Sequence, residues 1–254
     1  SGNTFTASEP EVSISGTLEG DLTLGIADGL GLYTLGYPGD NRPLTVAAGA
    51  TLSLSPGVVL RSENPGWDIF VDGRLEGTGA SVQLLYWDDY PAVSAALEVR
   101  AGGVVDLDGG AIRGPGEVLV YDGGQLDLSG VEYQVETEVP PNSDGGSPAT
   151  TYYAGSSGTI DGSVLNYLDL ASSITLTGSE IGYVELHGGV PTVTGNTFTD
   201  VNPVRVSDPD YLKLGGFSGN TFTASEPAVS MAGTLEGDLT LGIADGLGLY
   251  TLGW

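Results

Sequence analysis

The sequence contains no cysteine and only one histidine, His187, among its 254 residues. Without cysteine the chain has no disulfide bonds, no thiolate ligands for a metal and no cysteine nucleophile. A single imidazole indicates neither a multi-histidine metal site nor a Ser/His/Asp set. We therefore expect His187, which follows Leu186 at a strand end, to have a surface or corner role.

Positive charge is also scarce. Lysine and arginine number 7 against 33 aspartate and glutamate residues, and the formal net charge is −26. Such a chain repels phosphate backbones and anionic lipid surfaces, so we expect no nucleic-acid partner. No run of about 18 apolar residues predicts a membrane-spanning helix, and we expect no membrane insertion in this segment. The acidity suits cation binding, a high-salt medium or simple repulsion between particles.

The chain does contain a repeat of its own opening. Residues 1–36 return as residues 218–253, and only Glu11/Ala228, Ile14/Met231 and Ser15/Ala232 differ. The offset of 217 residues indicates one whole unit, residues 1–217, followed by the start of the next copy, residues 218–254. We expect the second copy to continue the same structure, with no hinge between the two.

Shorter repeats lie inside the long unit. Residues 44–54, 97–107 and 118–128 align without a gap, so that apolar residues match apolar residues and Gly49, Gly102 and Gly123 coincide. The pattern of each segment predicts two strands of alternating polarity joined at a glycine corner, and residues 69–75 are a shortened version. In the second half of the chain, Gly162, Gly178, Gly195 and Gly219 recur at a closer spacing.

These spacings are too short for a strand, a helix and a return strand, which need roughly 30 residues. They fit one turn of an all-β solenoid, in which each coil of short strands stacks on the previous one. We expect roughly ten coils per 217-residue unit. Asn196 and Asn220 recur at matching corners, where we expect them to cap turns or to stack as an amide ladder.

Two sets of residues carry a resemblance to a known family. Residues 44–60, LTVAAGATLSLSPGVVL, followed by IFVDGRLEGTG, resemble the opening coils of extracellular parallel β-helix proteins. The GNTFT copies at Gly2, Gly195 and Gly219 resemble repeats of the pectate-lyase-like superfamily. The resemblance implies a right-handed parallel β-helix, a secreted or cell-surface location and, in one branch, carbohydrate-acting enzymes. The lysine and arginine clusters of its polysaccharide lyases are missing here.

Two groups of side chains are candidates for a site. Asp106 aligns with Asp127, and Asp108 lies two residues further along the same strand. These outward carboxylates have three interpretations: an acid and nucleophile pair of a retaining glycosidase, a calcium site, or solvated surface residues. The loop residues Trp87, Asp88, Asp89 and Tyr90 combine rings with acids, which suits glycan binding or a packing contact.

The sequence therefore predicts a non-catalytic structural unit of a tandem-repeat extracellular fibre, filament or cell-surface stalk. Its expected partners are adjacent repeat units end to end, with neighbouring filaments or surface polysaccharide as further partners. No cofactor is expected apart from calcium at Asp106, Asp108 and Asp127. The alternative is a carbohydrate-active enzyme, a polysaccharide hydrolase or lyase, or a glycan-binding adhesin on the same scaffold.

Overall fold

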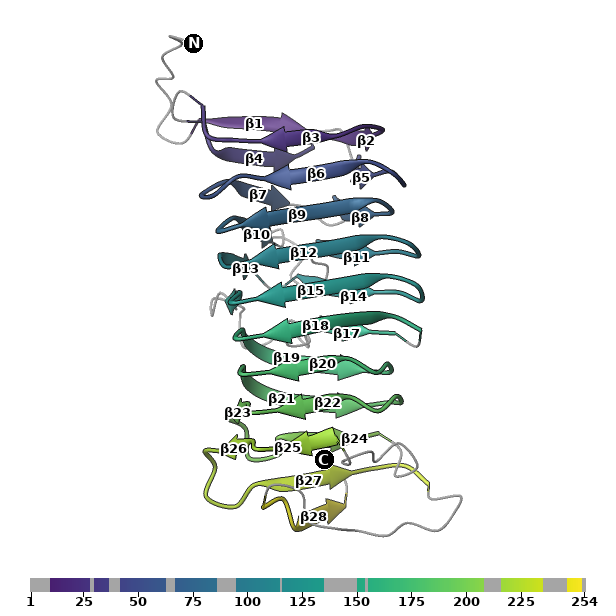
Figure 1. Ribbon diagram of the computed structural model, residues 1–254, viewed down its shortest axis with the longest axis vertical. Coiled ribbons are helices and arrows are strands. Elements are labelled where there is room, and N and C mark those ends of the chain that lie inside the picture. The colour runs from purple at the N-terminus through teal and green to yellow at the C-terminus, as the bar shows by residue number, and fades with distance from the viewer. Residues whose placement is uncertain are drawn as a thin grey trace, which may run out of the picture.

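The computed structural model describes residues 10–27, 30–36, 42–62, 67–85, 95–114, 116–134, 150–153, 155–207, 216–234 and 246–252. The described residues form strands and turns and contain no α-helix. Their strands make two parallel sheets of 19 and 9 strands that rise as stacked rungs from the N-terminal to the C-terminal end (Figure 1). The predicted all-β parallel solenoid is confirmed.

Successive strands of the chain lie on three faces of the column, which we call the first, second and third ladders. The larger sheet contains the first two ladders, because β19 (Val164–Leu170) and β21 (Glu180–Leu186) run through the corner and belong to both. The other strands of the first ladder are β1 (Glu11–Ile14), β4 (Leu32–Leu35), β7 (Val59–Ser62), β10 (Ser81–Leu84), β13 (Ala111–Arg113), β16 (Glu132–Gln134), β23 (Thr197–Phe198) and β26 (Thr221–Phe222).

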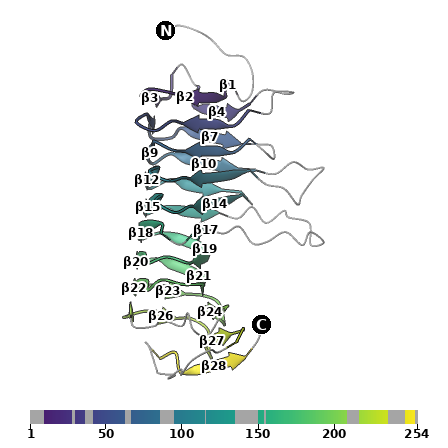
Figure 2. The same cartoon turned by 90° about the vertical axis from the view of Figure 1, so that its right-hand side faces the viewer.

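The second ladder faces a different side of the column, as the view turned by 90° shows (Figure 2). Its other strands are β2 (Gly16–Leu18), β5 (Leu44–Val46), β8 (Ile69–Val71), β11 (Ala96–Val99), β14 (Glu117–Val120), β17 (Thr150–Tyr152), β24 (Val204–Val206), β27 (Ala228–Met231) and β28 (Leu249–Leu252). The third ladder consists of β3 (Leu22–Leu24), β6 (Thr51–Leu54), β9 (Arg74–Thr78), β12 (Val104–Asp108), β15 (Gln125–Ser129), β18 (Ser157–Asp161), β20 (Thr175–Thr177), β22 (Thr192–Thr194) and β25 (Phe217–Ser218).

The predicted alignment of the short repeats is the observed stacking. Leu97 pairs with Val118 on the second ladder, and Val105 pairs with Leu126 on the third. The shortened repeat lies between the others, since Ile69 pairs with both Leu44 and Leu97. Alternate side chains therefore point into the column and stack in continuous, mostly apolar columns. The second ladder supplies two of these columns, which contain Leu44, Ile69, Leu97, Val118, the buried Thr150, Leu168, Val184, Val204 and Val229, and Val46, Val71, Val99, Val120, Tyr152, Leu170, Leu186, Val206 and Met231.

A column of small polar side chains lines the corner between the third and first ladders. The hydroxyl of Ser179 accepts a hydrogen bond from the backbone N–H of Ser163, and Oδ1 of Asn196 accepts one from the N–H of Ser179. Asn220 Oδ1 in turn accepts hydrogen bonds from the backbone and side-chain nitrogens of Asn196, at 3.0 and 3.1 Å. The expected amide ladder is confirmed for this pair, and it satisfies backbone donors that are buried at the corner.

Strand pairing continues from the first copy of the repeat into the second. Ser218 pairs with Thr194 on the third ladder, and Phe222 pairs with Phe198 on the first. The rings of Phe198 and Phe222 are stacked with centroids 5.3 Å apart. Nine steps along the first ladder lead from β1 to β26, and β27, the counterpart of β1, follows, so a unit holds a little more than nine coils, close to the roughly ten expected.

Adjacent glycines at one corner provide a matched test of this stacking. Gly102 has φ of +83°, and a Cβ there meets no atom within 4 Å, whereas a Cβ on Gly103 lies 1.9 Å from the carbonyl oxygen of Val71 in the preceding coil. We expect Gly102→Ala to lower the free energy of unfolding by about 1 kcal/mol, through backbone strain alone. Gly103→Ala forces the coils apart, and we expect a loss of about 3 kcal/mol or more. Urea denaturation of both variants measures the difference, and equal losses would contradict the described coil contact.

Candidate functional site

Acidic side chains gather on the outward face of the third ladder. Glu76 pairs with Asp106, and Asp106 pairs with Asp127, on three successive strands. They point outward because their neighbours Leu75, Val105 and Leu126 fill the column. The predicted adjacency of Asp106 and Asp127 is therefore confirmed.

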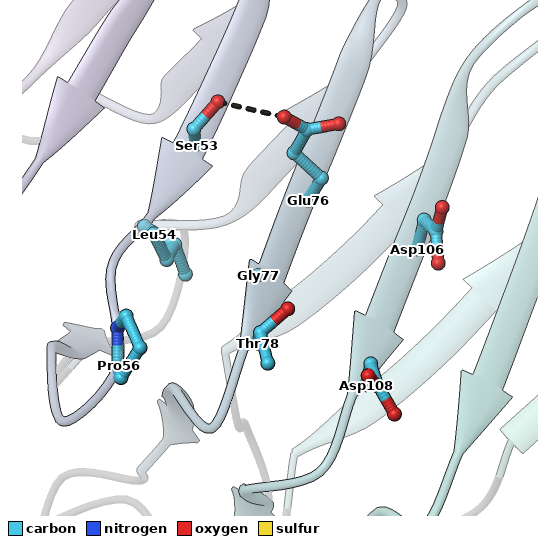
Figure 3. A pocket seen from close by; sticks show the side chains of 8 residues that line it. All are labelled: Ser53, Leu54, Pro56, Glu76, Gly77, Thr78, Asp106 and Asp108. Atoms are coloured by element: carbon cyan, nitrogen blue, oxygen red, sulfur yellow. Dashed lines mark hydrogen bonds between the residues drawn. The ribbon is translucent and has the colours of Figure 1, made fainter.

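One end of this acidic column borders a pocket of about 370 Å³ (Figure 3). It lies over β6, β9 and β12, and Glu76 and Asp106 come from neighbouring strands at one side of it. Asp108 extends from the end of β12, beside Thr78. The pocket is lined by Ser53, Leu54, Pro56, Glu76, Gly77, Thr78, Asp106 and Asp108.

Arg74 neutralises part of this charge. Its Nε donates to Oε2 of Glu76 at 2.7 Å, and its terminal nitrogen donates to Oδ2 of Asp106 at 2.5 Å. The Ser53 hydroxyl donates to the other oxygen of Glu76 at 2.9 Å. The hydrogen bond from Arg74, followed by that from Ser53, lowers the pKa of Glu76. Glu76 is thus held as a carboxylate, which is the opposite of what a proton-donating acid requires.

The oxygens of Asp127 are also occupied. Oδ1 accepts hydrogen bonds from the backbone N–H and the hydroxyl of Thr159, at 2.8 and 2.5 Å, and Oδ2 accepts one from Gln125 at 2.5 Å. Asp106 and Asp127 are therefore held by different partners on opposite sides. In the part of the chain that the structure describes, no group of three or more acidic or histidine side chains is arranged to hold a metal ion. A calcium site at Asp106, Asp108 and Asp127 stays a prediction.

The other predicted group, Trp87, Asp88, Asp89 and Tyr90, lies outside the described residues. The structure describes the strands on either side of it, β10 and β11. Glycan binding or packing by this loop stays a prediction.

The structure reveals a second polar cluster that the sequence analysis missed, on the outward face of the second ladder. The Ser207 hydroxyl and Nδ1 of His187 form a hydrogen bond of 2.7 Å. On the other side of the ring, Nε2 lies 3.2 Å from Asp169 Oδ1 and 3.4 Å from Glu185 Oε1. A Ser, His and Asp set does therefore meet here, although His187 has the expected surface position at a strand end, with 34% of its side chain exposed.

Aromatic rings and a cation close one side of this cluster. The rings of Tyr167 and Tyr183 stack with centroids 4.6 Å apart, and the guanidinium of Arg205 lies 3.4 Å from the centroid of Tyr183. The Tyr167 hydroxyl donates to Oε2 of Glu185 at 3.1 Å. The cluster joins three coils through charge-assisted hydrogen bonds and a cation–π contact. Its chemistry is that of an imidazole held between a hydroxyl and two carboxylates.

Burial affects the carboxyl group of Asp169. Desolvation raises its pKa, although the nearby His187 acts in the opposite direction. Since the folded-state pKa lies above the unfolded value, ionised Asp169 destabilises the fold at neutral pH. This contribution is absent below the unfolded pKa and grows as the pH rises through the folded pKa.

Comparison with known proteins assigns no family to the chain. No protein-family model matches it, no curated protein matches it, and no solved structure matches it. Among the described residues there is also no helix of the length and apolarity needed to cross a membrane.

The Asp169 carboxyl gives a pH-dependent prediction. We expect Asp169→Asn to raise the melting temperature at pH 7, because it removes a carboxylate that burial disfavours. The gain relative to the unmodified chain should shrink as the pH falls, because Asp169 becomes protonated in the unmodified chain. Calorimetry between pH 4 and pH 8 measures this difference. A loss of stability at pH 7 would show instead that attraction to His187 outweighs desolvation.

Proposed function

We propose that this chain is a non-catalytic structural unit of a tandem-repeat fibre, filament or cell-surface stalk. The observation that carries the proposal is the pairing of second-copy strands with first-copy strands, at β25, β26 and β27. A backbone ladder that crosses the repeat boundary lets length grow with repeat number while each interior coil keeps both edges covered.

Side-chain stacking along the axis supports a mechanical role. Tyr121 and Tyr153 lie in neighbouring coils with ring centroids 5.0 Å apart and planes 2° from parallel. Phe70 is covered by the guanidinium of Arg100, which lies 3.6 Å from the ring centroid. Each of these contacts covers one face of a ring, and Tyr153 keeps 41% of its surface exposed. The outward aromatic residues thus join neighbouring coils.

The location and the finer family assignment belong to the same proposal. Residues 44–60 resemble opening coils of extracellular right-handed parallel β-helix proteins, and the GNTFT copies resemble repeats of the pectate-lyase-like superfamily. A net charge of −26 keeps long particles apart in solution by mutual repulsion. We infer an extracellular or cell-surface location, with the next repeat unit as the principal partner.

The first test is the shape of an array. Stacked coils rise about 4.8 Å each, so a unit of nine to ten coils adds about 45 Å to the length. We expect tandem chains of three, six and nine 217-residue units to form straight rods whose length increases by this amount per unit. Electron microscopy measures the length, and globules on flexible tethers would contradict the proposal.

The second candidate function is a carbohydrate-active enzyme or adhesin, and the pocket beside Glu76 and Asp106 is the observation in its favour. The hydrogen bonds from Arg74 argue against acid catalysis there. Release of reducing sugar from a polysaccharide, abolished by Asp106→Ala, would favour this candidate over the structural one. Retention of the chain on a polysaccharide column, lost on replacing Trp87, would indicate an adhesin.

Calcium binding by the outward carboxylates is tested separately. If Ca²⁺ binds the native chain, linkage requires the melting temperature to rise with free Ca²⁺ and to fall on adding a chelator. We expect the rise to be lost in Asp127→Asn, since Asp127 is one of the three predicted calcium ligands. An unchanged melting temperature with and without Ca²⁺ would remove calcium from the proposal.

A further inference from the structure

The repeated sequence occupies two different faces of the column. In the first copy, β1 and β4 lie on the first ladder, where β4 pairs with β7. Their counterparts 217 residues later are β27 and β28, which lie on the second ladder, where β27 pairs with β24. The second copy is thus displaced by one face relative to the first.

The coil itself is built in the same way in both copies. Val12 pairs with Tyr33 and Ile14 with Leu35 in the first copy. At the same offset, Val229 pairs with Tyr250 and Met231 with Leu252 in the second. The register between the two strands is identical in both copies. The copies therefore fold in the same way and differ only in the ladder on which each copy begins.

The displacement follows from the number of coils in a unit. Nine steps along the first ladder lead from β1 to β26, and β27 follows on the next face. One 217-residue unit therefore advances nine full coils and one further face, which is one-third of a coil. A unit with a whole number of coils would return β27 to the first ladder.

The same strand has different neighbours in the two copies. In the first copy, Leu35 is fully buried, and β7 covers β4 by pairing Val59 with Leu32. In the second copy, the counterparts Leu249 and Leu252 are 48% and 87% exposed. The segment that fits this edge is the second copy's own counterpart of β7, which would cover β28 as β7 covers β4.

We propose that successive units of the array are turned by one-third of a turn about the fibre axis, in addition to the twist of the ladders. This inference rests on the proposed tandem array. The column of Glu76, Asp106 and Asp127 then moves to the next face in each unit and returns after three units, about 130 Å along the axis. The carboxylates surround the fibre instead of lining one side, which opposes lateral sticking of fibres from every direction.

Disulfide trapping can test on which ladder β27 of the second copy lies, because the sequence has no cysteine of its own. Arg205 pairs with Ser230 on the second ladder, and adjacent parallel strands lie about 4.8 Å apart, within disulfide range. We expect Arg205→Cys with Ser230→Cys to oxidise in the folded chain. Ser207→Cys with Ala232→Cys is a second pair at the same contact, since the N–H of Ala232 bonds to the carbonyl of Val206.

The control pair is Thr199→Cys with Ser230→Cys. If the second copy kept the face of the first, β27 would lie on the first ladder above β23, Val229 would stack on Phe198, and Ser230 would lie beside Thr199. Thiol counts after unfolding should show few free thiols in the first two variants and two free thiols in the control. Oxidation of the control with free thiols in both other variants would overturn the inference.

This result is independent of fibre formation. If arrays form straight rods but only the control variant oxidises, the proposed function stands and the one-third turn is refuted. The expected disulfides in a chain whose arrays form no rods would refute the function alone. In rods that form, gold labels on a cysteine at Ser53 of each unit should lie on three sides of the axis, and a single line of labels would contradict the rotation.

Discussion

The hydrogen bonds between the backbones of successive coils are the constraint on which the rest of this structure depends. A parallel pair of strands has one register, and a slip by one residue would turn every inward side chain outward. Each coil therefore repeats the phase of the coil before it. This is why Leu97 stacks on Ile69 and under Val118, and why positions far apart in sequence form straight columns.

Differences in coil length are absorbed at the corners. The glycines of the second half are spaced by 16, 17 and 24 residues, yet the N–H of Gly162 bonds to Thr177 and that of Gly195 bonds to Ser218. Left-handed corner residues such as Gly195, with φ of +67°, turn the chain from the third ladder onto the first without disturbing the strands. This corner also leaves backbone donors inside the column, and the Ser and Asn side chains there satisfy them.

On the outward faces of an acidic solenoid, equivalent positions of successive coils stack, so carboxylates lie next to one another and repel. The apolar core has no such repulsion. Arginine partners two residues away along the chain, or one coil away, relieve the repulsion between carboxylates. Arg74 lies beside Glu76 and Asp106, and Arg100 pairs with Glu98 while covering a ring. With about 40% of the side chains exposed, as for Arg74 and Glu76, such pairs contribute little to stability, about 0–1 kcal/mol. Their effect is to reduce the repulsion between stacked carboxylates.

Sequence patterns alone determined the solenoid, its glycine corners, the stacked Asn196 and Asn220 and the neighbouring Asp106 and Asp127, because a period-two alternation with fixed corners leaves one way to stack the strands. Only the tertiary structure brought Ser207, His187 and Asp169 together, since their separations of 18 and 20 residues become contacts only when the lengths of two particular coils are known. It also decided that the second copy starts on another face. The face on which the second copy starts depends on the lengths of all corners in the unit added together. No local pattern in the sequence determines that total.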